Sequence, residues 1–202
     1  MAIKDHSLDP LIIQAARSEF LEHGYQKASL HKIAEQAGIT TGALYTRYRN
    51  KDDLFCSLVK PVLQEMSEHF TPIRSRYEQV RQNPSADAQL EVIRQEEQIY
   101  LNLLFQHYED CILFFCRSGG SSLEKSLQQM MALKSRETVA FFRSIARQEL
   151  DYEGIELIMS QQFYYYRQIL ERGCSREKAM SCMKTVELFL EAGWRELFRQ
   201  IL

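Results

Sequence analysis

Side chains suited to contact nucleic acid gather in one short stretch, "TTGALYTRYRNK", at residues 40–51. Threonine and tyrosine hydroxyls can donate to phosphate oxygens or base edges, and arginine and lysine attract phosphates. Glycine and alanine within the stretch add so little bulk that a backbone could approach DNA closely there. The candidate contact residues are Thr40, Thr41, Gly42, Ala43, Tyr45, Thr46, Arg47 and Lys51.

Such a face needs a short helix that a second helix holds in place, and the surrounding residues predict both. Ser29 can cap a helix that Gly38 ends, and Thr40 can cap the next one. Ala34 is small where the two helices would touch, and Leu44 points inward between them. This spacing is typical of a helix-turn-helix. The alternative is a packed helix pair that never touches DNA, which many helical proteins contain.

Two further helix signals flank this pair. Asp9 before Pro10 predicts a helix start, and Gly24 predicts the end of that helix. Asn50 can cap a fourth helix, with Asp53 placed to return the capping interaction. Four helix starts so close together predict a compact small domain.

The 202-residue chain predicts an all-α fold, because apolar residues recur three and four positions apart and no alternating strand pattern occurs. We expect a three-helix domain over residues 1–50 and a larger helical bundle over residues 51–202. Hydrophobic residues make up 45% of the chain, which argues against disorder. With no apolar run of about 18 residues and no secretion signal, we expect no membrane partner and a cytoplasmic location.

Charge differs between the two parts. The chain carries a formal net charge of −2, but residues 1–51 hold seven basic and five acidic side chains. A phosphate responds mainly to charges within a Debye length, roughly 10 Å at 0.1 M salt. The local basic excess therefore matters more than the average when nucleic acid is considered as a partner.

The segment "AARSEFLEHGYQKASLHKIAEQAGITTGALYTRYRNKDDLF" resembles the N-terminal signature of the TetR-type regulators over about residues 10–58. The matching elements are "F..HGY", "IA..AG" and "G.LY..Y..KDDLF". The resemblance implies a homodimer that binds a palindromic double-stranded DNA operator. Its third helices would enter successive major grooves about 34 to 36 Å apart.

Position by position, the resemblance implies a role for each residue. Helix caps that also touch phosphates are Ser29 and Thr40. Residues that face bases are Thr41, Gly42 and Ala43. Residues that hold the DNA backbone are Tyr45, Thr46 and Lys51. Arg47 and Arg49 depart from the residues usual in the family, and both could add phosphate contacts, or Arg47 could read a guanine.

Beyond residue 50 the predicted helices lengthen. Pro61 predicts a kink in the fourth helix, and a break is expected across "TPIRSRYEQVRQNPSAD", residues 71–87. Asn83 and Pro84 indicate a fresh helix start, and the apolar pattern from Leu90 onward carries this helix towards Tyr108. Later helices are expected over approximately residues 109–117, 122–150, 152–172 and 176–202.

The resemblance also implies that the last two helices form a dimer interface, and two stripes of residues at helical spacing suit it. The stripe residues are Ile158, Gln162, Tyr166 and Ile169, followed by Met183, Val186, Leu190, Gly193 and Leu197. Two stripes per chain would form a four-helix interface across a two-fold axis. The alternative is that both stripes face the core of their own chain.

A cavity for a small-molecule effector is expected in the larger domain, with flexible methionines and flat aromatic rings favouring a hydrophobic or aromatic ligand. The candidate lining residues are Met66, Phe70, Phe105, Tyr108, Phe114, Met130, Phe141 and Tyr165. The alternative is that these side chains simply fill the core.

The expected function is therefore a sequence-specific DNA-binding regulator, a repressor that a small effector releases from its operator. No enzyme activity or cofactor is expected. One alternative is a metal or thiol redox sensor that uses Cys111 and Cys116 with His107. Another is an enzyme or a protein-binding adaptor whose helix-turn-helix no longer binds DNA.

Overall fold

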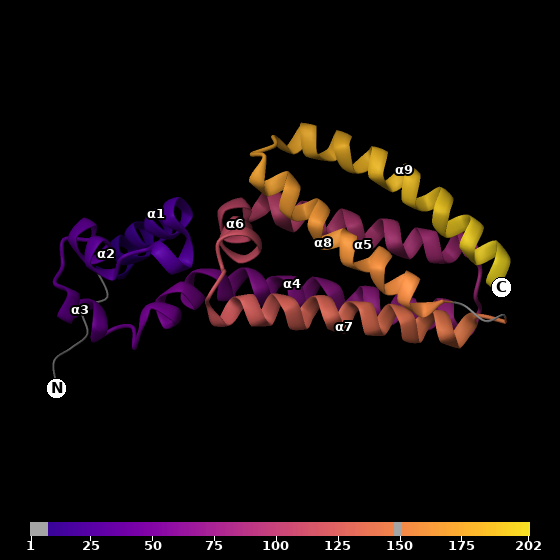
Figure 1. The fold of residues 1–202 in the computed structure, drawn as a ribbon, viewed down its shortest axis with the longest axis horizontal. Coiled ribbons are helices and arrows are strands. Elements are labelled where there is room, and N and C mark those ends of the chain that lie inside the picture. The colour runs from indigo at the N-terminus through magenta and orange to yellow at the C-terminus, as the bar shows by residue number, and fades with distance from the viewer. Residues whose placement is uncertain (1–7, 148–150) are drawn as a thin grey trace. The chain divides into compact units, whose positions relative to one another are not determined.

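The computed structural model describes residues 8–147 and 151–202, and the side chain of Phe70 falls outside the described part. Within these ranges the chain folds into helices without any strand, which confirms the predicted all-α class (Figure 1). The helices are α1 (Asp9–Lys27), α2 (Leu30–Gln36), α3 (Thr41–Tyr45), α4 (Lys51–Gln82), α5 (Ala86–Gln106), α6 (Tyr108–Cys116), α7 (Ser122–Ile145), α8 (Tyr152–Glu171) and α9 (Arg176–Ile201). Across the described ranges, none of the helices combines the length and apolarity needed to span a membrane.

The chain divides into two compact units. The N-terminal unit takes the residues up to Leu63 together with Glu109–Leu127, so it includes α6 as well as α1 to α3. The second unit takes Gln64–Tyr108 and Gln128–Leu202. The N-terminal unit therefore differs from the domain expected over residues 1–50, and both α4 and α7 contribute residues to both units.

The core of the N-terminal unit forms on one face of α1. Ile12, Ala16 and Phe20 recur every four residues and are fully buried. The ring of Phe20 meets that of Phe55 edge-on, with centroids 4.8 Å apart, and the Tyr25 ring lies 5.2 Å from Phe55. Such ring pairs add about 0.5–1.5 kcal/mol beyond their buried area. This cluster fixes α1 against the first turns of α4.

The ends of α1 correct the expectation from the sequence. The N-cap residue is Leu8, and its side chain makes no capping hydrogen bond. Asp9 instead lies in the first turn, where a carboxylate is favoured by the positive end of the helix dipole. Gly24 has a φ of +70°, but the helix resumes after this kink and continues to Lys27.

The start of α4 follows its sequence signals. The Asn50 side-chain oxygen accepts from the Asp53 backbone N–H at 2.8 Å. The Asp53 carboxylate in turn accepts from the Arg49 backbone N–H at 3.0 Å. The predicted reciprocal cap is confirmed, with the returning bond one residue earlier than in the standard capping box.

The length of α4 corrects a second expectation. The helix runs through both Pro61 and Pro72, so the break expected across residues 71–87 is confined to residues 83–85. A proline inside a helix costs roughly 3 kcal/mol, because it removes an N–H and crowds the preceding turn. Packing offsets this cost, since buried residues recur on one face throughout α4: Leu54, Leu58, Val62, Met66 and Ile73.

Aromatic rings form the core of the second unit. Phe142 stacks on Phe198 with ring centroids 5.4 Å apart, and Trp194 lies 5.5 Å from Phe142. Isoleucines from three helices are buried in the same cluster. α5 packs along α9 beside it (Figure 1). α8 and α9 occupy the predicted ranges, whereas α7 ends at Ile145, before the expected end at residue 150, which is outside the described part.

Replacing Leu44 tests how the two short helices are held together. The Leu44 side chain is only 1% exposed, so Leu44→Ala should lower the free energy of unfolding by about 2–5 kcal/mol. Urea denaturation measures the loss. The neighbouring Tyr45→Ala serves as the control and should change stability by no more than about 0.5 kcal/mol, because the Tyr45 side chain is exposed. Equal losses in the two variants would contradict the packing.

Candidate functional site

A tight turn joins α2 to α3. Gly38 has a φ of +69°, which glycine adopts without steric cost. The Gly38 N–H donates to the Glu35 carbonyl at 3.1 Å, and the Ile39 N–H donates to the Ala34 carbonyl at 2.9 Å. Ala34 and Leu44 are almost fully buried, as the sequence predicted. The two helices therefore form the predicted helix-turn-helix.

Hydroxyl side chains cap both short helices. The Ser29 Oγ accepts from the Lys32 backbone N–H at 3.4 Å, and the Thr40 Oγ1 accepts from the Ala43 N–H at 3.1 Å. The Thr46 hydroxyl donates to the Ala43 carbonyl at 2.7 Å at the other end of α3. The two predicted caps are confirmed, and their backbone partners leave part of each hydroxyl available to a phosphate.

The outward face of α3 is open. Thr40, Gly42, Tyr45 and Thr46 are exposed, and the Tyr45 side chain is 52% exposed. A Cβ added at Gly42 would meet only the Thr40 hydroxyl, at 3.8 Å. Packing within the chain therefore does not explain the glycine. Thr41 and Ala43 are half-buried beside it, so this face could approach a partner very closely.

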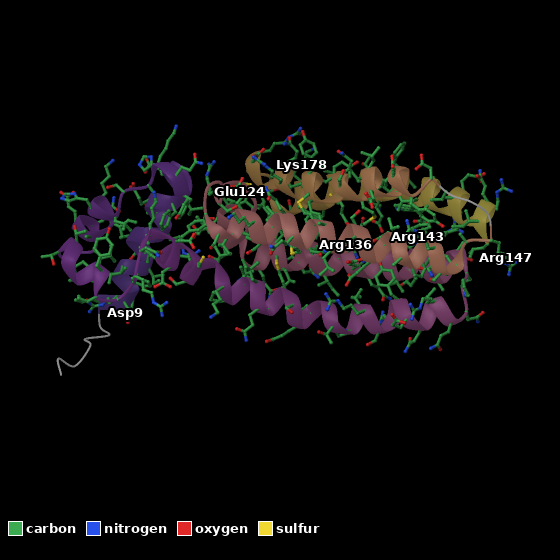
Figure 2. The ribbon with its side chains drawn as sticks, turned by 60° about the horizontal axis from the view of Figure 1, so that its bottom comes forward. Asp9, Glu124, Arg136, Arg143, Arg147 and Lys178 are labelled. Carbon is green, nitrogen blue, oxygen red and sulfur yellow. The ribbon has the colours of Figure 1, made fainter. Side chains whose placement is uncertain are left out.

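Arg47 corrects the expectation that it points toward DNA. Its Nε donates to the carboxylate of Asp9 at 3.1 Å, and its Nη1 donates to the Ala43 carbonyl at 3.3 Å. The Arg47 side chain is only 13% exposed, and Asp9 lies at the start of α1 (Figure 2). The guanidinium therefore ties the end of α3 to α1. The sequence signal for Asp9 was a helix cap, which concealed this pairing.

Lys51 is also held by α1. Its Nζ donates to the Gln26 carbonyl at 3.0 Å and lies 5.0 Å from the centroid of the Tyr25 ring. Burial lowers the pKa of the Lys51 ammonium below its usual value. Lys51 therefore stabilises the end of α1 in this conformation, and its predicted phosphate contact would compete with these bonds.

Other cations of the N-terminal unit remain available. Lys27, Lys32 and Arg49 are exposed, and their side chains make no hydrogen bond or ion pair with any part of the chain that the structure describes. Only Arg49 among them was a candidate from the sequence. Lysine and arginine side chains are exposed in most positions of folded proteins, so nothing in the residue pattern singled out Lys27 and Lys32.

A buried carboxylate orders the start of α2. Glu19 is nearly fully buried on α1, and its Oε1 accepts from the Ser29 backbone N–H at 2.8 Å. The His23 Nε2 lies 3.6 Å from the Glu19 carboxylate. Glu19 was not among the residues predicted from the sequence, although an acid beside Phe20 on the apolar face of α1 was a visible signal. The Glu19 carboxylate connects α1 directly to the helix-turn-helix.

The segment Glu109–Leu127 packs in the same unit as α1. Arg17 forms an ion pair with Asp110 on α6. After α6, the Arg117 Nε donates to the Leu21 carbonyl at 2.9 Å, and the Arg117 carbonyl accepts from the Tyr25 N–H at 2.9 Å. These bonds fasten the C-terminal half of α1 to the chain that follows α6.

The start of α7 is attached to the start of α4. The Asp52 carboxylate accepts from the Ser122 backbone N–H at 2.9 Å and from the Ser122 hydroxyl at 2.6 Å. These hydrogen bonds lower the pKa of Asp52 against the opposing effect of burial. The Cys56 thiol lies 3.3 Å from the same hydroxyl. Asp52 therefore anchors α7 as well as favouring the N-terminus of α4.

A cavity of about 320 Å³ lies within the second unit. Its walls come from α4, α5, α7, α8 and α9. Of the predicted lining residues, Phe141 and Tyr165 are part of the wall. The structure corrects the other candidates, which lie elsewhere: Met66, Phe105, Tyr108, Phe114 and Met130. The side chain of Phe70 lies outside the described residues.

Several polar groups line this cavity, whose expected form was an apolar wall with a few polar groups. Gln89 is 0% exposed, and its amide nitrogen and oxygen have no hydrogen-bond partner in the described part. The Glu96 carboxylate accepts from the Tyr77 hydroxyl at 2.7 Å and forms an ion pair with Lys134. Burial, with the charges of Glu187 and Glu96 nearby, raises the pKa of Glu97 to about 7.

The residues of the two stripes predicted for a dimer interface do not share one surface: some lie in the core, some line the cavity and Gly193 is exposed. Their core-facing members are buried inside their own chain, which leaves no surface for a partner: Tyr166, Ile169 and Met183. Gln162, Leu190 and Ile158 line the cavity, and Leu197 packs on the second unit's core. Val186 is half-buried and Gly193 is exposed. The large apolar side chains that α8 and α9 expose are Leu157, Ile158, Tyr164, Met180, Leu188 and Phe189.

The cysteines expected for a sensor are not grouped with metal ligands. Across the described residues, no three or more histidine, cysteine, aspartate or glutamate side chains form a group that could hold a metal. Cys111 is buried, and burial raises the pKa of its thiol to about 12. A thiol in this state is a poor nucleophile at neutral pH. The His107 Nε2 lies 2.8 Å from the Glu65 carboxylate.

The N-terminal helices are similar in sequence to those of known bacterial regulators. Residues 12–58 match the family model "Bacterial regulatory proteins, tetR family". The Fatty acid metabolism regulator protein of Bacillus subtilis (strain 168) is 39% identical over 57 residues, which cover 28% of this chain and 29% of that protein. The Probable acrEF/envCD operon repressor of Escherichia coli (strain K12) is 40% identical over 63 residues, 30% of this chain and 29% of that protein. The matched segment spans less than a third of these relatives.

Solved structures match nearly the whole fold. A TetR-like transcriptional regulator from Rhodococcus sp. RHA1 has a TM-score of 0.60 and 18% identity, covering 95% of this chain and 100% of that one. The fatty acid degradation regulator FadR from Bacillus halodurans has a TM-score of 0.58 and 20% identity, covering 92% and 98%. These likenesses show the fold, an N-terminal helix-turn-helix domain followed by a helical bundle.

The raised pKa of Glu97 predicts how stability depends on pH. The folded state holds the Glu97 proton up to about pH 7, whereas the unfolded chain releases it near pH 4.5. This group should therefore lower the free energy of unfolding as pH rises from 4.5 to 7, by at most about 1.4 kcal/mol per pH unit. Urea denaturation between pH 5 and 8 should show a smaller decline for Glu97→Gln. Parallel pH profiles for the variant and the parent protein would contradict the burial effect.

Proposed function

We propose that this chain, whose residues 12–58 form a TetR-family helix-turn-helix domain, is a homodimeric transcriptional repressor that a small molecule releases from its DNA operator. The regulators of Bacillus subtilis and Escherichia coli match it only over this domain, so the proposed activity of the whole protein rests on the geometry of its own residues. One observation supports DNA binding above the others. The exposed face of α3 contains a glycine that packing does not require.

The surface of this face suits a DNA groove. Thr40 and Ser29 stand at the N-termini of α3 and α2, where backbone N–H groups and the helix dipole favour a phosphate. Tyr45 and Thr46 are exposed for contact with the backbone, and Gly42 allows close approach to bases. The exposed cations Lys27, Lys32 and Arg49 supply attraction for phosphates.

Exposed apolar side chains on α8 and α9 support a homodimer. Leu157 is 70% exposed on α8, and the adjacent Leu188 and Phe189 are 72% and 78% exposed on α9. Apolar groups of this size are seldom left in water together when they have no partner. A second copy of the chain is the occupant that we propose, because two DNA-reading heads are needed for a palindromic operator.

Release would follow from changes in helices that line the cavity. α4 supplies Arg74 and Tyr77 to the cavity, and α7 supplies Lys134 and Phe141. The other ends of α4 and α7 belong to the N-terminal unit, where Asp52 bonds to Ser122. An effector that binds one arrangement of these helices more tightly would increase the fraction of molecules in that arrangement. Release requires that this arrangement hold the two helix-turn-helix domains in positions that do not fit the operator.

Replacing Gly42 separates DNA binding from folding. Gly42→Gln adds a long side chain to the open face, so affinity for operator DNA should fall at least tenfold, about 1.4 kcal/mol. The free energy of unfolding should stay the same or rise by up to about 1 kcal/mol, because glycine is a poor helix former. Fluorescence anisotropy with labelled DNA from beside the protein's own gene measures the affinity.

Gly154 provides a matched control. It also lies in the first turn of a helix, α8, and a Cβ placed there meets no atom within 4 Å. Gly154→Gln should bind DNA as the parent protein does. Unchanged affinity in Gly42→Gln would remove the main support for the proposed function.

The salt dependence of DNA affinity distinguishes the exposed side chains of Lys32 and Arg49 from that of Arg47, which is paired with Asp9. Lys32→Ala and Arg49→Ala should each reduce the slope of log affinity against log salt concentration by about 2, because each removes one phosphate contact from each of the two protomers. Arg47→Ala should mainly lower stability, since its guanidinium bonds to Asp9. Anisotropy titrations at four salt concentrations measure the slopes. A slope that changes only in Arg47→Ala would show that this arginine leaves Asp9 to contact DNA.

A further inference from the structure

One wall of the cavity carries polar groups that the chain itself leaves unsatisfied. Gln89, Glu96 and Glu97 share one face of α5 and line the cavity together. Gln89 is fully buried with both ends of its amide unpaired within the described chain. Because buried polar groups normally find hydrogen-bond partners, this amide indicates a partner that comes from outside the protein.

The two carboxylates on this wall differ in their partners. Glu96 is neutralised by Lys134 and also accepts a hydrogen bond from the Tyr77 hydroxyl. Glu97 is buried, and no residue in the described ranges gives it a hydrogen bond or an ion pair. A buried carboxylate without a partner is unfavourable when it is ionised. When Glu97 ionises, the interior of the cavity therefore gains a negative charge that no described group of the chain compensates.

The remaining charges near the cavity face water. Glu187 stands beside Glu97 but lies 3.4 Å from the Arg94 guanidinium, which compensates it. Arg136 and Arg143 on α7 (Figure 2) are exposed and do not line the cavity. The other charged lining residues, all of them exposed, are Arg74, Glu78, Arg81 and Glu137.

The wall that α7 and α9 contribute is aromatic. Phe142, Trp194 and Phe198 line the cavity; the ring of Phe142 stacks on that of Phe198, and the ring of Trp194 is tilted by 33° to that of Phe142. The faces of aromatic rings attract cations and also cover flat apolar groups. The two observations are independent: the aromatic wall favours a flat apolar body, and the unpaired carboxylate favours a positive charge on the ligand.

We propose that the cavity binds an organic cation, a protonated amine on a flat apolar body, with the ammonium group donating to Glu97 and the body packed against Phe142 and Trp194. A polar substituent of the ligand would pair with the Gln89 amide. The cavity of about 320 Å³ lies at the small end of ligand sites, roughly 300–1,000 Å³, so a two-ring amine suits its size. This inference deepens the proposed function and rests on it, because it names the class of the effector.

Proton binding by Glu97 supplies a signature of this contact. Burial raises the pKa of Glu97 to about 7, and a bound cation would lower it by favouring the ionised carboxylate. Affinity for the cation should therefore decrease as pH falls below 7. A neutral ligand of the same shape should show no such decrease.

Three probes with one naphthalene body test the proposal by titration calorimetry on the full-length protein. They are the cation of 1-naphthylmethylamine, the neutral alcohol 1-naphthalenemethanol and the carboxylate anion of 1-naphthaleneacetic acid. These compounds differ chiefly in charge. The amine should bind most tightly at pH 8 and more weakly at pH 6. Glu97→Gln should weaken amine binding at least about tenfold at pH 8 and change alcohol binding less than about threefold.

Controls keep the outcome interpretable. Glu156→Gln changes an exposed carboxylate on α8 outside the cavity and should bind all three probes as the parent protein does. Thermal melting confirms that each variant is folded. The proposal is overturned if the carboxylate or alcohol probe binds most tightly, if no probe binds up to millimolar concentration, or if folded Glu97→Gln keeps its affinity for the amine. DNA affinity is measured separately, so failure here with intact DNA binding leaves the repressor function standing.

Discussion

Packing beneath α3 is the constraint on which the DNA-binding hypothesis depends. A helix of five residues is too short to be stable alone in water, because nucleation outweighs the few hydrogen bonds that it forms. Its orientation is therefore set by Leu44, which is buried where α3 meets α2, and by two small buried residues, Ala34 on α2 and Ala37 directly after it. Because Leu44 faces the core, the opposite side of α3, which carries Gly42 and Tyr45, faces outward.

Several basic and acidic side chains hold this arrangement and are not free for recognition. Arg47 joins the end of α3 to Asp9, Lys51 bonds to the end of α1, and Glu19 orders the start of α2. These contacts join α1 to α2, α3 and α4 within the N-terminal unit. α4 and α7 contribute residues to this unit and also line the cavity, which is why the proposed release of DNA by an effector involves these two helices.

Local features were predictable from the sequence, whereas features that need distant partners were not. Ser29, Thr40 and Asn50 cap their helices as expected, because a cap depends on the next three residues. The role of Arg47 depends on a partner 38 positions away in the chain. The cavity requires the register of five helices, so most of its predicted lining was wrong. Apolar stripes on α8 and α9 revealed helices but not which neighbour each stripe faces.

The most direct test of the central claim is selection of binding sequences from random duplex DNA, followed by hydroxyl-radical footprinting. The account predicts enrichment of one palindrome, protected at two half-sites whose centres lie about one helical turn, roughly 34–36 Å, apart on one face of the duplex. A protein that enriches no sequence, or that protects a single half-site without two-fold symmetry, would contradict it.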